Sequence, residues 1–345
     1  MQRLRRLLVA LAVVLSPGAA AAQPAPGPAT DQVPDPSSVT ARSYAEFLTF
    51  GPHRAFVLGG DGKPYWWAGV GGPDPGTAVD NALKRCAERS PPPCRLQTVN
   101  NVTVSGTAWR DAVPARAPDA PDIGRLRPEP YWSMRGPQLA NGLVVWSHGY
   151  RAGKNATDSA PQPWIGRFTR LGYDLYRFDR EWIADWASDA TALAETIRKA
   201  RALGYRRILL AGQSAGAWVS LAALARGAPV DGVISIAAAH HGEVKDMRDT
   251  TRARSEWQHM LEAIKPGARL FVVNFANDAY DVGGRMQDAR RIFAKSGVVA
   301  EIVDAPEGFS GHGAGADFAF ARKFGPCLQA FIEQGTRQKP CGTTD

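Results

Sequence analysis

Two hydrophobic patterns alternate along the carboxyl-terminal part of this 345-residue chain. Short, nearly continuous apolar runs, typical of strands covered on both faces, are separated by segments whose apolar residues recur at helical spacing. The runs expected as strands are 142–149, 173–179, 206–212, 232–239, 269–275 and 300–305. The segments expected as helices are 165–171, 188–203, the stretch after Ser214, 251–264, 286–295 and 317–333. Because helices of this length connect parallel strands by right-handed crossovers, the pattern predicts an α/β fold with a doubly wound, mostly parallel sheet.

A small α+β module is expected ahead of this alternation, within residues 40–109. Its expected elements are a short helix at 43–50, strands at 55–60 and 64–70, a helix at 77–89 and a strand at 94–104, a ββαβ order after the first helix. Trp66 and Trp67 fit either ordinary core and surface positions of a small sheet or a platform on which a ligand stacks. The proline-rich stretch 110–130 is expected to be a linker or a loop on the surface.

The amino terminus has the pattern of a secretory signal peptide, expected to span residues 1–22. A positive segment, MQRLRR, precedes a short apolar core, and small residues at 20–22 offer a cleavage site before Gln23. The apolar core is shorter than the roughly 20 residues that cross a bilayer, so no membrane span is expected in the mature chain. Residues 23–39 are proline-rich and polar and are expected to be a disordered leader. These features predict a periplasmic or secreted protein.

The four cysteines all follow this expected signal peptide: Cys86, Cys94, Cys327 and Cys341. An even number of cysteines in an oxidising compartment favours disulfides. Pairing each cysteine with its sequence neighbour would close two short loops and tie the tail, 337–345, to the main domain, although the sequence leaves the other two connectivities open. The spacings do not match a C-x-x-C metal site, and no metal is expected. The segment around Cys86 resembles small secreted bacterial modules in which a helix ending A-L-x-x-C is followed by C-x-(L/V) and a strand.

The formal net charge of +8 does not indicate a nucleic-acid-binding protein. Three of the positive charges, Arg3, Arg5 and Arg6, lie in the expected signal peptide. The rest of the chain has no run of five or more basic residues and no basic helix face with interleaved aromatic residues. The expected partner is instead a small molecule.

The pentapeptide GQSAG, residues 212–216, lies between an expected strand and an alanine-rich helix. In a parallel sheet of this kind, functional sites form at the carboxyl ends of the strands. The residues expected at that edge are His148, Gly149, Tyr150, Ser214, His240, His241, Asn277, Asp278, Asp281, Ser310 and His312. A serine acts as a nucleophile when a histidine accepts its proton, an acid orients that histidine and N–H groups stabilise the oxyanion.

The segment from about Leu143 to Glu333, within an expected domain at 131–336, resembles an α/β-hydrolase in the order of these residues. The motifs are S-H-G after the first core strand, G-Q-S-A-G at the strand-to-helix turn, a later acid, and G-H-G near the carboxyl terminus. The resemblance implies that Ser214 is the nucleophile and His312 the general base. It also implies an oxyanion hole formed by the N–H of Ala215 and a backbone N–H at Gly149 or Tyr150.

Several other residues at this edge have more than one interpretation. The expected acid is Asp278, directly after its strand, with Asp281 as the alternative. His240 and His241 could supply the base or a metal ligand, but they precede the acid, so they are expected to line the pocket. His148 is expected to fix its loop, and Gln213 is a further pocket candidate. Trp164 fits either a pocket wall or ordinary core packing.

The predicted function is that of an exported serine hydrolase that cleaves carboxylic esters of a small acyl substrate without a cofactor. A serine peptidase or amidase on the same fold is the second interpretation, although no acidic specificity anchor is visible in the sequence. The third is a catalytically inactive hydrolase fold that binds the cell envelope through the small module. Fold alone does not choose among them.

Overall fold

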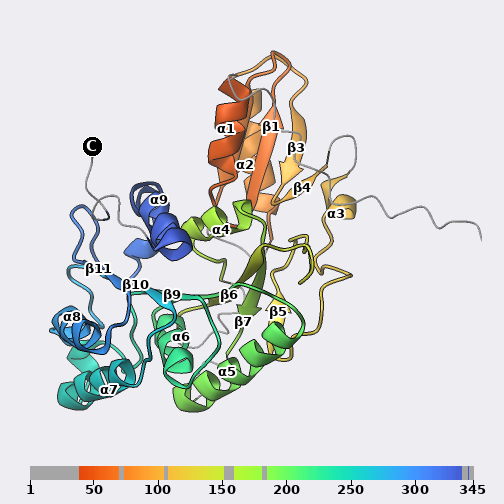
Figure 1. Ribbon diagram of the computed structural model, residues 1–345. Helices are drawn as coiled ribbons and strands as arrows, with labels where there is room; N and C mark the ends of the chain where they lie inside the picture. The colour runs from red at the N-terminus through yellow and green to blue at the C-terminus, as the bar shows by residue number, and fades with distance from the viewer. Residues whose placement is uncertain are drawn as a thin grey trace, which may run out of the picture.

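The computed structural model describes residues 39–69, 74–104, 108–150, 159–180, 185–335 and 341. The expected signal peptide and all but the last residue of the expected leader lie outside the described residues. Two sheets organise the described chain, a large one and a smaller one that projects from it (Figure 1). None of the helices in the described ranges has both the length and the apolar character needed to cross a membrane.

The large sheet has seven strands in the order β11-β10-β9-β8-β6-β7-β5. Their bounds are β5 Leu126–Pro128, β6 Gly142–Ser147, β7 Tyr173–Phe178, β8 Ile208–Gln213, β9 Gly232–Ile236, β10 Arg269–Asn274 and β11 Ala300–Asp304. Strands β6 to β11 are parallel, and β5 pairs antiparallel with β7 at one edge. The predicted α/β class with a doubly wound, mostly parallel sheet is therefore confirmed.

Helices cover both faces of the large sheet (Figure 1). One face carries α5 Trp186–Ala202, α6 Ala215–Ala225, α7 Thr250–Glu262 and α8 Arg285–Ser296. The other carries α4 Gly166–Arg170, with the single turn η2 Pro163–Ile165 before it, and α9 Phe318–Gln334. Because both faces are covered, β6 to β10 are almost entirely buried, which explains their continuous apolar sequences.

The small sheet has the order β2-β1-β3-β4, with a helix on each face. Its elements are α1 Val39–Phe47, β1 Arg54–Leu58, β2 Pro64–Ala68, α2 Gly76–Ala87, β3 Arg95–Val99 and β4 Val102–Thr103. A disulfide between Cys86 and Cys94 links the end of α2 to the start of β3. A second disulfide, Cys327–Cys341, ties residue 341 to α9.

The prediction of one continuous strand at 94–104 was wrong, because the chain reverses within it. Asn100 has a φ of 53°, a left-handed conformation that asparagine adopts more readily than most residues. Its side-chain oxygen accepts from the N–H groups of His53 (2.7 Å) and Arg54 (3.2 Å), which holds the turn against β1. The module is therefore ββαββ after α1.

The proline-rich stretch 110–130 is only partly the linker that its composition suggests. It contains the single-turn helix α3 Trp109–Ala112 at its start and β5 near its end. Ile123 is fully buried in the main core, and Glu129 is buried beside Arg177. A three-residue strand that contains a proline is tolerated here because it lies at the sheet edge.

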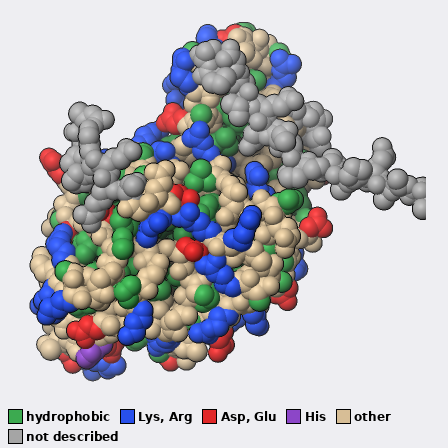
Figure 2. Space-filling view, viewed as in Figure 1, with side chains coloured by type: hydrophobic (Ala, Val, Ile, Leu, Met, Phe, Trp, Pro, Cys, Tyr) green, Lys and Arg blue, Asp and Glu red, His purple; other side chains and the backbone are tan. Residues whose placement is uncertain are grey.

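The small sheet is packed against the main unit by specific contacts as well as by the chain connection. Phe50, which follows α1, belongs to the main core, and its ring lies 5.1 Å from that of Phe318 on α9. At Gly166 any side chain would collide with the backbone of Phe50. The smaller unit still stands out as a distinct projection in the space-filling view (Figure 2).

Candidate active site

Ser214 is the single residue between the end of β8 and the start of α6. Its φ of 56° and ψ of −122° lie outside the usual regions for a residue with a side chain, a strain of roughly 1–3 kcal/mol. Its N–H donates to Ile236 O (3.0 Å), and its carbonyl accepts from the N–H of Ala239 (3.2 Å). These bonds to the end of β9 hold the strained turn in place.

The two glycines of GQSAG are required by close backbone approach. A Cβ at Gly212 would lie 2.5 Å from the carbonyl carbon of Gly216, on the far side of the turn. A Cβ at Gly216 would overlap the carbonyl of Ser147 and lie 2.6 Å from His148 O. The first turn of α6 can therefore pack against the ends of β6 and β8 only when both positions lack a side chain.

Ser214, His312 and Asp278 form a continuous hydrogen-bonded chain. His312 Nε2 lies 2.7 Å from Ser214 Oγ, and His312 Nδ1 lies 2.9 and 3.0 Å from the two carboxylate oxygens of Asp278. A carboxylate only accepts hydrogen bonds, so the Nδ1 atom carries the proton and Nε2 accepts the hydroxyl proton of Ser214. This tautomer is the one that a general base requires.

The loop after β10 brings Asp278 to His312 and leaves Asp281 elsewhere. Asp278 Oδ1 accepts from the N–H of Tyr280 (2.9 Å), a local turn that fixes the carboxylate. Asp281 instead accepts from the N–H of Gly283 (3.0 Å) and from the Asn274 side chain. The position of Asp278 directly after its strand and the observed contacts therefore favour the same carboxylate.

Tyr280 is a residue at this site that the sequence did not single out. Its ring centroid lies 4.2 Å from that of His312, with the planes tilted by 36°. The sequence feature that could have predicted its position is an aromatic residue two positions after the acid. Such a spacing is too common to be informative. The ring covers one face of the imidazole.

Two of the residues expected to donate to an oxyanion, Ala215 and Gly149, lie beside Ser214. Ala215 is the first residue of α6, so its N–H is one of the four at the helix start that have no partner within the helix. A Cβ added to Gly149 would lie 3.3 Å from Ser214 Cβ, so the Gly149 backbone directly adjoins the serine. Half of the Tyr150 surface is exposed.

His148 is buried and hydrogen-bonded through both ring nitrogens. Its Nδ1 donates to Gly149 O (2.7 Å), and its Nε2 accepts from the N–H of Arg180 (3.3 Å), which requires the neutral ring. Burial lowers the pKa of His148 to about 4, and the positive charge of Arg180 acts in the same direction. Arg180 also donates to the carbonyl of His148, so the loop that contains Gly149 is tied to the end of β7.

His240 and His241 lie next to this site but are not bonded to Ser214. Burial lowers the pKa of His240 to about 4, and its ring packs against those of Trp186 and Trp218. His241 Nε2 lies 3.0 Å from Glu256 Oε2. The described residues include no group of three or more His, Cys, Asp or Glu side chains arranged to hold a metal.

Gln213 contacts the loop of His312, whereas Trp164 lies in the core. Gln213 Nε2 donates to His312 O (3.3 Å), so this side chain holds the histidine loop. Trp164 has no exposed surface and donates to Gln162 Oε1 (2.8 Å) within the core. The pocket interpretation of Trp164 is corrected to core packing, because the side chain is enclosed between α9 and the sheet.

Comparison with known proteins gives only distant similarity. No family model matches the chain. No curated protein matches it either. Among solved structures, the chain is similar to a truncated carbohydrate esterase from gut microbiota (13% identity, 60% of this chain and 88% of that one, TM-score 0.43). It is also similar to the Pyrococcus furiosus esterase Pf2001 (15% identity, 56% and 81%, TM-score 0.42) and to a Dyadobacter fermentans phospholipase/carboxylesterase (16% identity, 51% and 85%, TM-score 0.35).

Proposed function

We propose that this protein is a serine hydrolase of the α/β-hydrolase type that cleaves carboxylic esters. The observation that carries the proposal is the chain from Asp278 through His312 to Ser214 Oγ, with distances of 2.9 and 2.7 Å. Such a chain activates a serine hydroxyl that would otherwise be a weak nucleophile. The strained backbone of Ser214 supports the same role, because strain of this kind occurs preferentially at functional sites.

In the proposed first half-reaction, Ser214 Oγ bonds to the carbonyl carbon of the ester as its proton moves to His312 Nε2. Asp278 stabilises the resulting imidazolium through Nδ1. The oxyanion accepts hydrogen bonds from the Ala215 N–H and from a backbone N–H at Gly149 or Tyr150. When the tetrahedral intermediate collapses, His312 returns the proton to the departing alcohol and an acyl-enzyme remains.

In the second half-reaction, water replaces the alcohol. His312 removes a proton from water as the water oxygen bonds to the acyl carbon, and the same proton returns to Ser214 when the carboxylic acid leaves. The half-buried His240 would form a neutral wall near the acyl group above about pH 5, since burial lowers its pKa to about 4. We further propose export by the signal peptide at 1–22, in keeping with the two disulfides.

A panel of p-nitrophenyl esters and peptidyl anilides tests the reaction class. We expect ester turnover that is lost in Ser214→Ala and anilide turnover that is much slower. Preferred cleavage of anilides would replace the esterase with a peptidase or amidase. An absence of turnover on every acyl substrate by the folded protein would favour the inactive binding module.

A further inference from the structure

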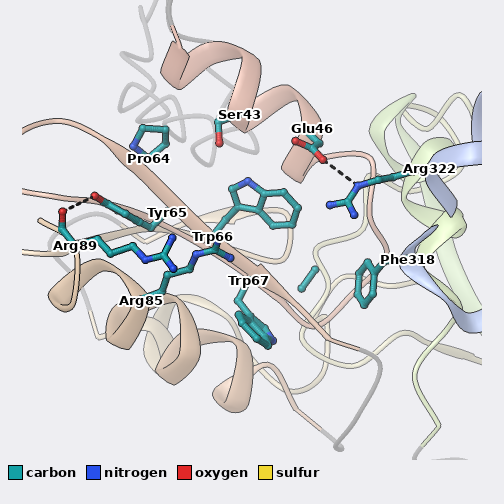
Figure 3. Close-up of a pocket in the computed structure, with 11 residues that line it drawn as sticks. Ser43, Glu46, Pro64, Tyr65, Trp66, Trp67, Arg85, Arg89, Phe318 and Arg322 are labelled. Atoms are coloured by element: carbon teal, nitrogen blue, oxygen red, sulfur yellow. Dashed lines mark hydrogen bonds and ion pairs between the residues drawn. The ribbon is translucent and has the colours of Figure 1, made fainter. Parts of the chain in front are cut away.

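A groove that shares no lining residue with Ser214, His312 and Asp278 runs along β2, which is an edge strand of the small sheet in the described part of the chain. It has a volume of about 640 Å³ and follows the whole of β2, the edge strand. Helices α1 and α2, which cover opposite faces of this sheet, form its walls, and α9 of the main unit closes one end (Figure 3). The residues that line it are Ser43, Glu46, Pro64, Tyr65, Trp66, Trp67, Ala68, Arg85, Arg89, Phe318 and Arg322.

The floor of the groove is a row of main-chain groups that point away from the sheet. In the β1–β2 ladder the bonded pairs alternate, and the flanking bonds from Gly59 N to Lys63 O and from Gly69 N to His53 O fix which pairs are bonded. The outward-facing residues are therefore Pro64, which offers only a C=O group, and Trp66 and Ala68, which each offer an N–H and a C=O group. Such an edge is a template for another extended chain.

The α2 wall of the groove is positively charged. Arg85 on α2 and Arg89 in the turn that follows it are exposed, and neither forms an ion pair with a carboxylate in the described part of the chain. On the opposite side, Arg322 pairs with Glu46 (3.2 Å). The uncompensated charge therefore lies on the α2 side, which Tyr65 and Trp67 also face.

The α1 side of the groove is aromatic. Trp66 packs against Phe50 (5.4 Å between ring centroids), and Phe50 packs in turn against Phe318. Trp67, on the other side, leaves 39% of its surface exposed. Because alternate side chains of a strand point to opposite faces, a chain added to β2 would meet cations on one side and aromatic rings on the other.

We propose that this groove binds an extended acidic segment of a partner protein, which adds to the small sheet as a strand beside β2. Its main chain pairs with the outward groups of Trp66 and Ala68. Alternate acidic side chains reach Arg85 and Arg89, and the intervening apolar side chains pack against Trp66 and Phe318. The continuous row of main-chain groups favours a peptide over an anionic glycan, which has no matching pattern of amide donors and acceptors.

The test measures fluorescence anisotropy of a labelled octapeptide of alternating valine and glutamate, titrated with the full mature chain. We expect saturable binding that weakens by about tenfold or more in Arg85→Glu/Arg89→Glu. The matched control is Lys84→Glu, which reverses an exposed charge on α2 outside the groove and should leave binding unchanged. A valine–lysine octapeptide should bind much more weakly.

Two further experiments distinguish binding by strand pairing from binding by charge alone. N-methylation of alternate amides in the valine–glutamate peptide removes the donors along one edge and should abolish binding. Ala68→Pro removes an outward N–H at a position where a strand edge tolerates proline, and it should weaken binding without changing ester turnover. The proposal is overturned if the peptide does not bind, if the N-methylated peptide binds equally well, or if oligogalacturonate binds in its place. Binding can be measured in Ser214→Ala, so its result is independent of the proposed hydrolysis.

Discussion

Asp278 and Asp281 are three residues apart on one loop, and their surroundings give them different roles. Asp278 presents both carboxylate oxygens to His312 Nδ1, and its side chain is 2% exposed. Asp281 faces the Asn274 side chain and lies 3.5 Å from Arg285 Nε. The backbone N–H of Tyr280 also donates to Asp278 Oδ1 and helps to hold this carboxylate in place.

Replacing Asp278 with asparagine should reduce kcat for ester hydrolysis by about 10³–10⁴-fold. The amide can present its NH₂ group to Nδ1, which favours the tautomer that cannot accept the serine proton. Steady-state kinetics on a p-nitrophenyl ester measure the effect. Asp281→Asn is the matched control and should retain most of the activity. A loss of kcat in Asp281→Asn comparable to the loss in Asp278→Asn would contradict the assignment of Asp278 as the acid.

His53, the residue directly before β1, is a buried histidine. It is 3% exposed, and neither of its ring nitrogens has a hydrogen-bond partner among the described residues. Burial lowers the pKa of His53 to about 4, and the charge of Arg177 acts in the same direction. The unfolded chain therefore binds a proton below about pH 6.5 that the folded protein does not bind until about pH 4.

This difference makes the protein less stable as the pH falls from 6.5 to 4. In that window His53 contributes a slope of about 1.4 kcal/mol per pH unit to the free energy of unfolding. His53→Asn should remove this slope while accepting the positive φ of 66° at this position. Urea unfolding at several pH values measures it, and an unchanged slope in the variant would contradict the buried neutral histidine.

At the scale of elements, the position of Ser214 depends on the packing of the first turn of α6 against the end of β6. Gly216 lies in that turn, against the carbonyl groups of Ser147 and His148. A helix position would ordinarily favour alanine over glycine by about 1 kcal/mol. The close approach reverses this preference, because the added methyl group has no space.

Gly216→Ala should therefore destabilise the protein by about 3 kcal/mol, as measured by denaturant unfolding. Gly313→Ala is the matched control, since Gly313 has a φ of −92° and, apart from its two chain neighbours, no described residue has a heavy atom within 4 Å of the position that the added methyl group would occupy. That variant should change stability by less than about 0.5 kcal/mol. Equal stability of the two variants would show that α6 can move away from β6.

The elements that sequence patterns predicted best are the buried ones. Continuous apolar runs such as 208–211 are readily assigned to buried strands of a parallel sheet. The order of these strands places Ser214 and His312 at one edge of the sheet. Strand β5 was missed because three residues with a proline have no periodicity, and only pairing with β7 defines them. The turn at Asn100 was missed, and the sequence left Trp164 open between a pocket wall and the core, because both positions depend on contacts with residues distant in the sequence.

At the scale of the whole molecule, Arg54 connects the small sheet to its surroundings. It is 1% exposed and donates to the carbonyls of Phe47, Phe50 and Asn100. Its guanidinium also lies 5.3 Å from the ring of Trp132, which belongs to the main core. The side chain thus joins α1, the turn after β3 and the main unit.

Arg54→Met should lower the free energy of unfolding by about 3 kcal/mol, because it keeps the apolar stem and leaves buried carbonyl groups without a donor. Thermal unfolding followed by circular dichroism measures the loss. Arg95→Met, at an exposed position on β3, is the control and should have little effect. A small effect of both substitutions would show that the small sheet is held mainly by its apolar contacts.

The central claim, that Ser214 attacks the substrate through the His312–Asp278 pair, is tested most directly by a fluorophosphonate, which captures an activated serine covalently. Intact mass and peptide mapping should find one phosphonyl group, located on Ser214, in the wild-type protein. Labelling should be absent in Ser214→Ala and strongly slowed in His312→Ala. A modification that persists in Ser214→Ala, or that maps to another residue, would contradict the account.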